Sequence, residues 1–131
     1  MKSVIRNLLL SLGAGVITCL IIYALPYGRA LDAIGLLLGV IAAVYIGFAI
    51  ADGRSHVLYL ECTVAAVFIL FALLGMWGQP VWLVVGFFAH GAWDLLHHPG
   101  KVGAKVRKWY PPACVVYDWF VGLYLVYWLG W

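Results

Sequence analysis

Residues 90–98, HGAWDLLHH, hold three of the four histidines and one of the five acidic residues of the chain. His90, Asp94 and His97 are spaced i, i+4 and i+7, so a helix would present all three on one face. Imidazole and carboxylate groups are ligands for divalent metals such as zinc, iron and manganese. The spacing therefore predicts a metal-binding or proton-handling face, whereas His98, turned about 100° from His97, is expected at its rim.

Further polar residues from other parts of the chain can complete such a site. Glu61 and Asp118 lie several residues inside apolar stretches, and the helical rise places them, with His90, roughly 6 to 12 Å below one membrane surface. Asp52 and His56 flank a break between two apolar stretches and would close the site from its rim. The predicted metal ligands are His90, Asp94, His97, Glu61 and Asp118, and the predicted catalytic groups are Glu61, His56 and Asp52.

The rest of the chain is too apolar for a soluble protein. Hydrophobic residues make up 66% of its 131 residues, charged residues 10%, and the mean hydropathy is +1.05. Its length gives room for one domain, residues 1–131. The net charge of +3 is attributed to membrane topology, and no nucleic-acid partner is expected. The three cysteines form no CxxC pair, which favours neither a disulfide framework nor a thiolate zinc site.

Five apolar stretches are long enough to cross a hydrocarbon core of about 30 Å as helices of roughly 20 residues. The breaks between them are rich in glycine, proline or charge. The sequence therefore predicts an all-α fold, a polytopic bundle of five transmembrane helices. The first stretch is longer than the apolar part of a signal peptide, so we expect an uncleaved helix. The expected ranges are 4–25, 31–51, 57–76, 80–98 and 112–130.

The basic residues predict the orientation of the bundle. With the N-terminus in the cytoplasm and the C-terminus outside, seven of the eight basic residues face the cytoplasm and only Arg29 faces outward. The same topology places every Asp, Glu and His except Asp32 on the cytoplasmic side. We therefore expect a multi-pass protein of the bacterial inner (plasma) membrane, with its polar site near the inner leaflet. The seven residues are Lys2, Arg6, Arg54, Lys101, Lys105, Arg107 and Lys108.

Residues 101–110, KVGAKVRKWY, form a basic segment with Val102, Val106 and Trp109 at helical spacing. This pattern is typical of a segment that lies in the membrane interface, with its lysines and arginine reaching lipid phosphates. The alternative is an ordinary positively charged loop. Beside an active site, this segment would hold an anionic headgroup at the mouth.

The strings HGAWDLLHH, KWYPPACVVYDW and GFAIADGR, with the helix that holds Glu61, resemble a bacterial family of small integral membrane proteins known only as a domain of unknown function. The resemblance covers the second to fifth expected helices and implies a multi-helix membrane fold. A looser analogy is to the alkaline ceramidase and adiponectin-receptor membrane hydrolases, in which His and Asp from several helices hold zinc for lipid amide hydrolysis. Those proteins have seven helices and a paired HxxxH motif, so only the chemical logic carries over.

Three functions fit these features. The first is a metal-dependent enzyme, a hydrolase or oxidase with zinc or iron, which acts on an amphiphilic, lipid-like substrate entering from the membrane lipids. The second is a non-catalytic accessory or assembly subunit of a homo-oligomer or larger membrane complex. The third is ion or proton transport, which is disfavoured because the outer half of the expected bundle offers no ionisable Asp, Glu or His besides Asp32.

Overall fold

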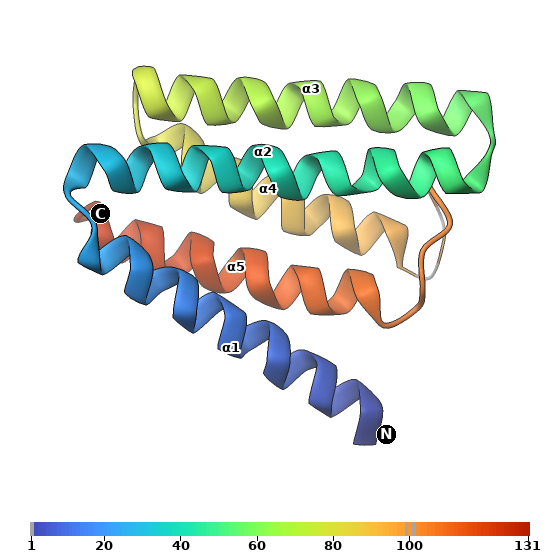
Figure 1. Cartoon of the computed structure of the whole chain (residues 1–131), viewed down its shortest axis with the longest axis horizontal. Helices are drawn as coiled ribbons and strands as arrows, with labels where there is room; N and C mark the ends of the chain where they lie inside the picture. The colour runs from blue at the N-terminus through green and yellow to red at the C-terminus, as the bar shows by residue number, and fades with distance from the viewer. Residues whose placement is uncertain (1, 99, 101) are drawn as a thin grey trace.

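The computed structural model of the chain describes residues 2–98, 100 and 102–131. These residues form five α-helices and no strand, which confirms the all-α prediction. The helices run back and forth along one axis and are joined by short turns, except for a longer loop between the fourth and the fifth (Figure 1). They are α1 (Lys2–Ala24), α2 (Tyr27–Asp52), α3 (Ser55–Trp77), α4 (Val81–His97) and α5 (Tyr110–Trp128).

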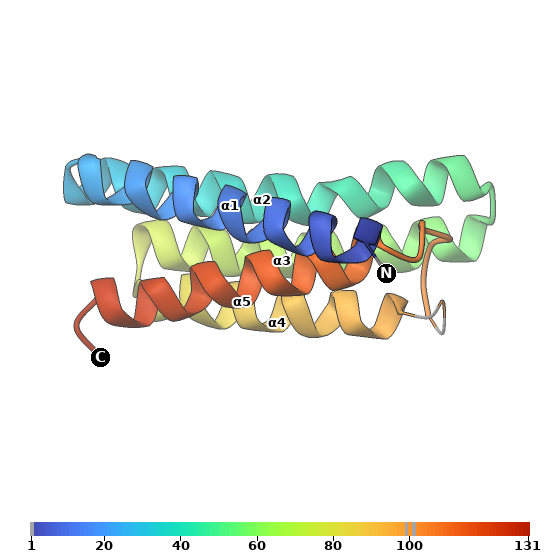
Figure 2. The same ribbon diagram turned by 90° about the horizontal axis from the view of Figure 1, so that it is seen from below.

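Because successive helices alternate in direction, one end of the bundle holds the N-terminus, the α2–α3 turn and the α4–α5 loop (Figure 1). We call it the loop end. The C-terminus lies at the opposite end, as the view from below also shows (Figure 2). The C-terminal half of α4 and the N-terminal half of α5 therefore approach each other near the loop end.

Three helices, namely α1 over Ser3–Ala24 together with α2 and α3, are long and apolar enough to cross a membrane. The 17 residues of α4 are equally apolar but fewer, and no other helix in the described part of the chain meets both conditions. In α5, Asp118 and two N-terminal prolines lower the hydropathy. Large apolar side chains such as Leu10, Leu36 and Leu70 are exposed on the outside of the bundle. The chain is a membrane protein whose outer surface suits lipid.

The core of the bundle lies between α2, α3, α4 and α5, in which α2 packs mainly on α3 and α4 mainly on α5. By contrast, α1 packs mainly on α5, where Thr18 and Tyr117 share a hydrogen bond of 2.9 Å between their hydroxyl oxygens. The first turns of α1 diverge from the rest of the bundle (Figure 1). The fully buried side chains of the core are Ala30, Ile34, Leu38, Leu83, Phe87, Val121 and Leu125.

The second helix begins earlier than the sequence analysis predicts. Pro26, with φ −55° and ψ 143°, directly precedes α2, and its carbonyl accepts a hydrogen bond of 2.9 Å from the backbone N–H of Ala30. Proline suits this position because its fixed φ prepares a helix start and no N–H is needed there. The break expected between the ranges 4–25 and 31–51 is therefore only the short connection before Tyr27.

The basic segment forms a loop, the alternative given above, and not a helix with Val102, Val106 and Trp109 on one face. Residues 102–109 form bends and turns, and Lys101 lies outside the described residues. Gly103 has a φ of 78°, a left-handed conformation that interrupts a helix. The backbone N–H of Ala104 donates to the carboxylate of Glu61 in α3 at 2.8 Å. The segment is thus a loop held down by a tertiary contact that its own sequence does not reveal.

Candidate metal centre

Five ionisable side chains are buried inside the bundle toward the loop end, and all five are predicted ligands. Each is at most 2% exposed. Removing a charge from water costs several kcal/mol unless partners compensate, so the partners of each side chain indicate its role. The contacts divide the five residues into two groups. They are Glu61 in α3, His90, Asp94 and His97 in α4, and Asp118 in α5.

The first group is His90, Asp94 and Asp118, which we call the His90 triad. Nδ1 of His90 lies 2.7 Å from Oδ2 of Asp118 and 3.6 Å from Oδ2 of Asp94. One ligand atom from each residue lies within 4.8 Å of the others. Two ligands bound to one tetrahedral zinc ion at about 2.1 Å lie roughly 3.4 Å apart. The triad can therefore hold a divalent metal ion with small shifts of its side chains.

Two buried atoms of the triad have no hydrogen-bond partner among the described residues. They are Nε2 of His90 and Oδ2 of Asp94. Buried polar atoms in folded proteins are paired in the great majority of cases. Oδ2 of Asp94 is therefore free to bind a metal ion, and the carboxylate of Asp118 belongs to the same group of ligand atoms.

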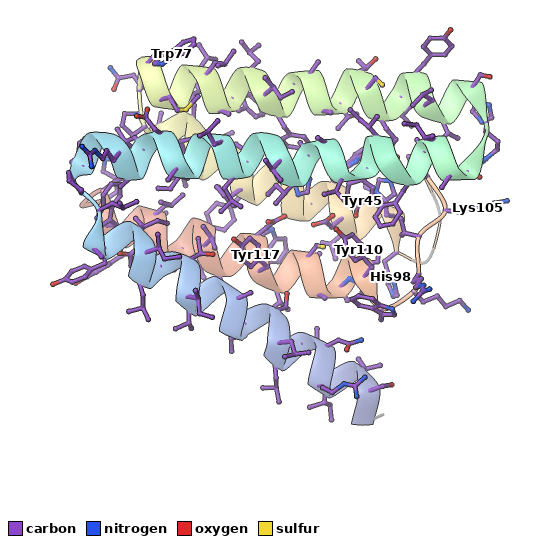
Figure 3. All side chains as sticks on the ribbon, viewed as in Figure 1. Tyr45, Trp77, His98, Lys105, Tyr110 and Tyr117 are labelled. Atoms are coloured by element: carbon purple, nitrogen blue, oxygen red, sulfur yellow. The ribbon has the colours of Figure 1, made fainter. Side chains whose placement is uncertain are left out.

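Tyr45 in α2 joins this site, although the sequence analysis does not include it. Its side chain points from α2 toward α4 and α5 (Figure 3). Its hydroxyl donates a hydrogen bond of 2.5 Å to Oδ1 of Asp94, and its ring centroid lies 4.2 Å from that of His97. The signal in the sequence is a phenol well inside an apolar helix, where an interfacial anchor is not needed.

The second group is the ion pair of His97 and Glu61, whose Nε2 and Oε1 atoms lie 2.8 Å apart. Nδ1 of His97 lies 3.1 Å from the backbone oxygen of Trp93, so both ring nitrogens have a partner. Oε1 of Glu61 also accepts the N–H of Ala104, and Oε2 accepts the indole N–H of Trp93 at 3.3 Å. Every polar atom of the pair is thus satisfied, and the pair joins α3, α4 and the loop.

Gly103 allows the loop to cover this pair closely. A Cβ atom built there would collide with Nε2 of His97 and Oε1 of Glu61. The positive φ of Gly103 is a second reason for glycine at this position. The pair therefore positions the loop, and it lies outside the group of side chains that converge on His90.

Neither Asp52 nor His56 has a hydrogen bond or ion pair with the His90 triad in the described structure. Asp52 accepts hydrogen bonds from Arg54, at 3.0 Å from Nε and 2.5 Å from Nη2, and from the backbone N–H of Lys105 at 3.4 Å. The hydrogen bond to Asp52 holds the pKa of the Arg54 guanidinium above its usual value. His56 is exposed in the first turn of α3. Asp52 thus fastens the α4–α5 loop to the end of α2.

Residues 6–130 match the model of one protein family, the Family of unknown function (DUF6010). The match includes most of α1 and all of the other four helices. No curated protein and no solved structure matches the chain. The comparisons therefore agree with the resemblance to a family of unknown function and give no support to the analogy with alkaline ceramidases.

Proposed function

The chain belongs to DUF6010, a family of unknown function, and we propose that it is a metal-dependent membrane enzyme acting on a lipid-like substrate. The His90 triad would hold the metal, and the chemistry would be hydrolysis or oxidation. The observation that carries the proposal is Oδ2 of Asp94, a buried carboxylate oxygen without a hydrogen-bond partner next to His90 and Asp118.

Charge balance favours a metal ion over a closed polar cluster. A protonated His90 balances one carboxylate, and its hydrogen-bond geometry assigns that carboxylate to Asp118. Asp94 then keeps the hydroxyl of Tyr45 and a longer ion-pair contact of 3.6 Å with the same His90. Two buried carboxylates that share one cation are costly in an apolar bundle. A divalent cation would offset both carboxylates.

The number of ligands favours a catalytic site. Structural zinc sites are closed by four protein ligands, whereas catalytic sites have three and keep a position open for water or substrate. The triad offers three, and its mixed nitrogen and oxygen donors suit zinc, iron or manganese. When bound, such an ion supplies Lewis acidity and an activated water molecule. The hydroxyl of Tyr45 orients Asp94 for this role.

We also propose that the His90 triad lies on the cytoplasmic side of the membrane. Arg54, Lys105, Arg107 and Lys108 lie at the loop end, and basic residues concentrate on the cytoplasmic side of membrane proteins. The loop end would then face the cytoplasm. The His90 triad, near this end, would act at the level of the inner leaflet of the plasma membrane.

Metal analysis of the purified protein tests the proposal. The full-length chain is purified in detergent without chelators, and its metal content is measured by mass spectrometry of the elements. We expect about one equivalent of a divalent transition metal per chain and a lower unfolding temperature after chelation. Metal well below one equivalent, together with unchanged stability in chelator, would rule out the metal enzyme and favour a non-catalytic subunit.

A further inference from the structure

A groove opens at the loop end between the diverging start of α1 and the start of α5. Its outer part has a volume of about 420 Å³ and is lined by Val4 and Leu8 of α1, by His98 and Lys108 of the loop, and by other residues. A second part of about 250 Å³ lies further along the two helices and is lined by Ser11 and other residues. The side chains of Asn7 and Trp109 line both parts, which therefore adjoin each other along α1 and α5.

The groove changes in polarity from its mouth to its walls. Lys108 and His98 are exposed at the mouth, and Figure 3 shows His98 beside the start of α5. Val4, Leu8 and Trp109 supply apolar walls. None of the described residues that line either part is acidic. Charge and shape therefore suit a molecule with an anionic head and an apolar chain.

The second part of the groove lies along the first turns of α5, the helix that holds Asp118. Cys114, which lines it, lies one helical turn before Asp118 in α5. Tyr110, also in its lining, packs edge-on against Tyr45 with 6.4 Å between the ring centroids. Because Tyr45 binds Asp94, Tyr110 and Tyr45 connect the lining of the groove to the triad.

We propose that this groove binds an anionic lipid with one phosphate in its headgroup, as the substrate or an analogue of the substrate of the proposed enzyme. Lys108 binds the phosphate, and Trp109 packs against the first part of the apolar chain, as does the start of α1. The assignment of this lipid as substrate rests on the function proposed for the His90 triad, whereas binding of the lipid depends on the groove alone.

Native mass spectrometry of the full chain in detergent tests the binding. Phosphatidylglycerol and phosphatidylcholine with identical acyl chains serve as probes, and inorganic phosphate serves as a competitor. We expect retention of one phosphatidylglycerol, with weaker retention of phosphatidylcholine and no displacement by millimolar phosphate. Equal retention of the two lipids, or displacement by inorganic phosphate, would overturn the proposal.

Two matched variants locate the binding site. Lys108→Gln removes the charge at the mouth and is expected to weaken phosphatidylglycerol binding about fivefold. Lys105→Gln removes the same charge from the same loop, but its side chain is 80% exposed and points away from the groove (Figure 3). We expect Lys105→Gln to bind as the natural chain does. Equal loss in both variants would show general attraction to a basic surface and would overturn the assignment to the groove.

Measuring the metal content distinguishes a failure of the lipid proposal from a failure of the proposed enzyme function. Lys108→Gln leaves all three residues of the triad in place and is expected to retain the metal of the natural chain. Selective lipid binding by a chain without metal would uphold the groove and contradict the enzyme. Full metal content without selective lipid binding would uphold the metal centre and contradict the groove.

Discussion

The hydroxyl of Tyr45 donates a hydrogen bond of 2.5 Å to Oδ1 of Asp94, so that one oxygen of this carboxylate is fixed, while Oδ2 has no hydrogen-bond partner and lies 3.6 Å from Nδ1 of His90. Two helices that are distant in sequence thus determine the orientation of one ligand. This relationship makes the proposed metal centre testable at a residue that would not itself bind the metal.

Tyr45→Phe should weaken metal binding without removing a ligand. The substitution leaves Oδ1 of Asp94 buried and unpaired, which costs about 1 to 3 kcal/mol, and frees the carboxylate to rotate. We expect the metal affinity to fall about 10- to 100-fold, as for other partners of metal ligands. Competition with a chromophoric chelator measures the metal affinity. Tyr59→Phe, on an exposed face of α3, is the matched control. Equal affinity in Tyr45→Phe and the natural chain would contradict this role.

Glu61→Gln should loosen the α4–α5 loop and leave the metal content unchanged. The variant removes the charge that pairs with His97, while its amide oxygen can still accept the N–H of Ala104. We expect trypsin to cleave the loop faster at Lys105 or Arg107. Gel electrophoresis of the digested, detergent-solubilised chain measures the rate of cleavage. Loss of metal from Glu61→Gln would instead show that Glu61 is a ligand, as the sequence analysis predicts.

Gly103→Ala should destabilise the protein more than an alanine at a left-handed φ does where there is no collision. Both the left-handed φ and the collision with His97 and Glu61 oppose a side chain there. Gly53→Ala is the matched control, since Gly53 has a φ of 77° with nothing near its hypothetical Cβ. We expect Gly53→Ala to cost about 1 kcal/mol and Gly103→Ala to lower the unfolding temperature further. Equal shifts in thermal unfolding would mean that the loop does not rest on the pair.

Apolar stretches predicted the five helices because a membrane span requires a long run of apolar residues. They did not predict the start of α2, since the residues that follow Pro26 are polar enough to resemble a loop. The conformation of residues 102–109 depends on Glu61, which is distant in sequence, so local spacing did not distinguish an interfacial segment from a loop. The orientation of the termini in the membrane stays a prediction.

The burial of the predicted ligands followed from the sequence, but their division into two groups did not. Residues seven apart in a helix share a face and yet lie about 10 Å apart along its axis. His90 and His97 therefore meet different partners, Asp118 and Glu61. Depth estimates from sequence place Glu61 and Asp118 at similar levels but do not give the rotation of their helices. Tyr45 escaped notice because a single tyrosine in an apolar helix also suits simple packing.

Anomalous X-ray diffraction at the absorption edge of the metal found in the purified protein tests the central claim most directly. We predict one anomalous peak between His90, Asp94 and Asp118 in crystals of the full chain grown without chelators. The peak should vanish in Asp118→Asn and persist in Asp32→Asn, which makes the same change at an exposed position. No peak at the triad, or one that survives Asp118→Asn at full height, would contradict the account.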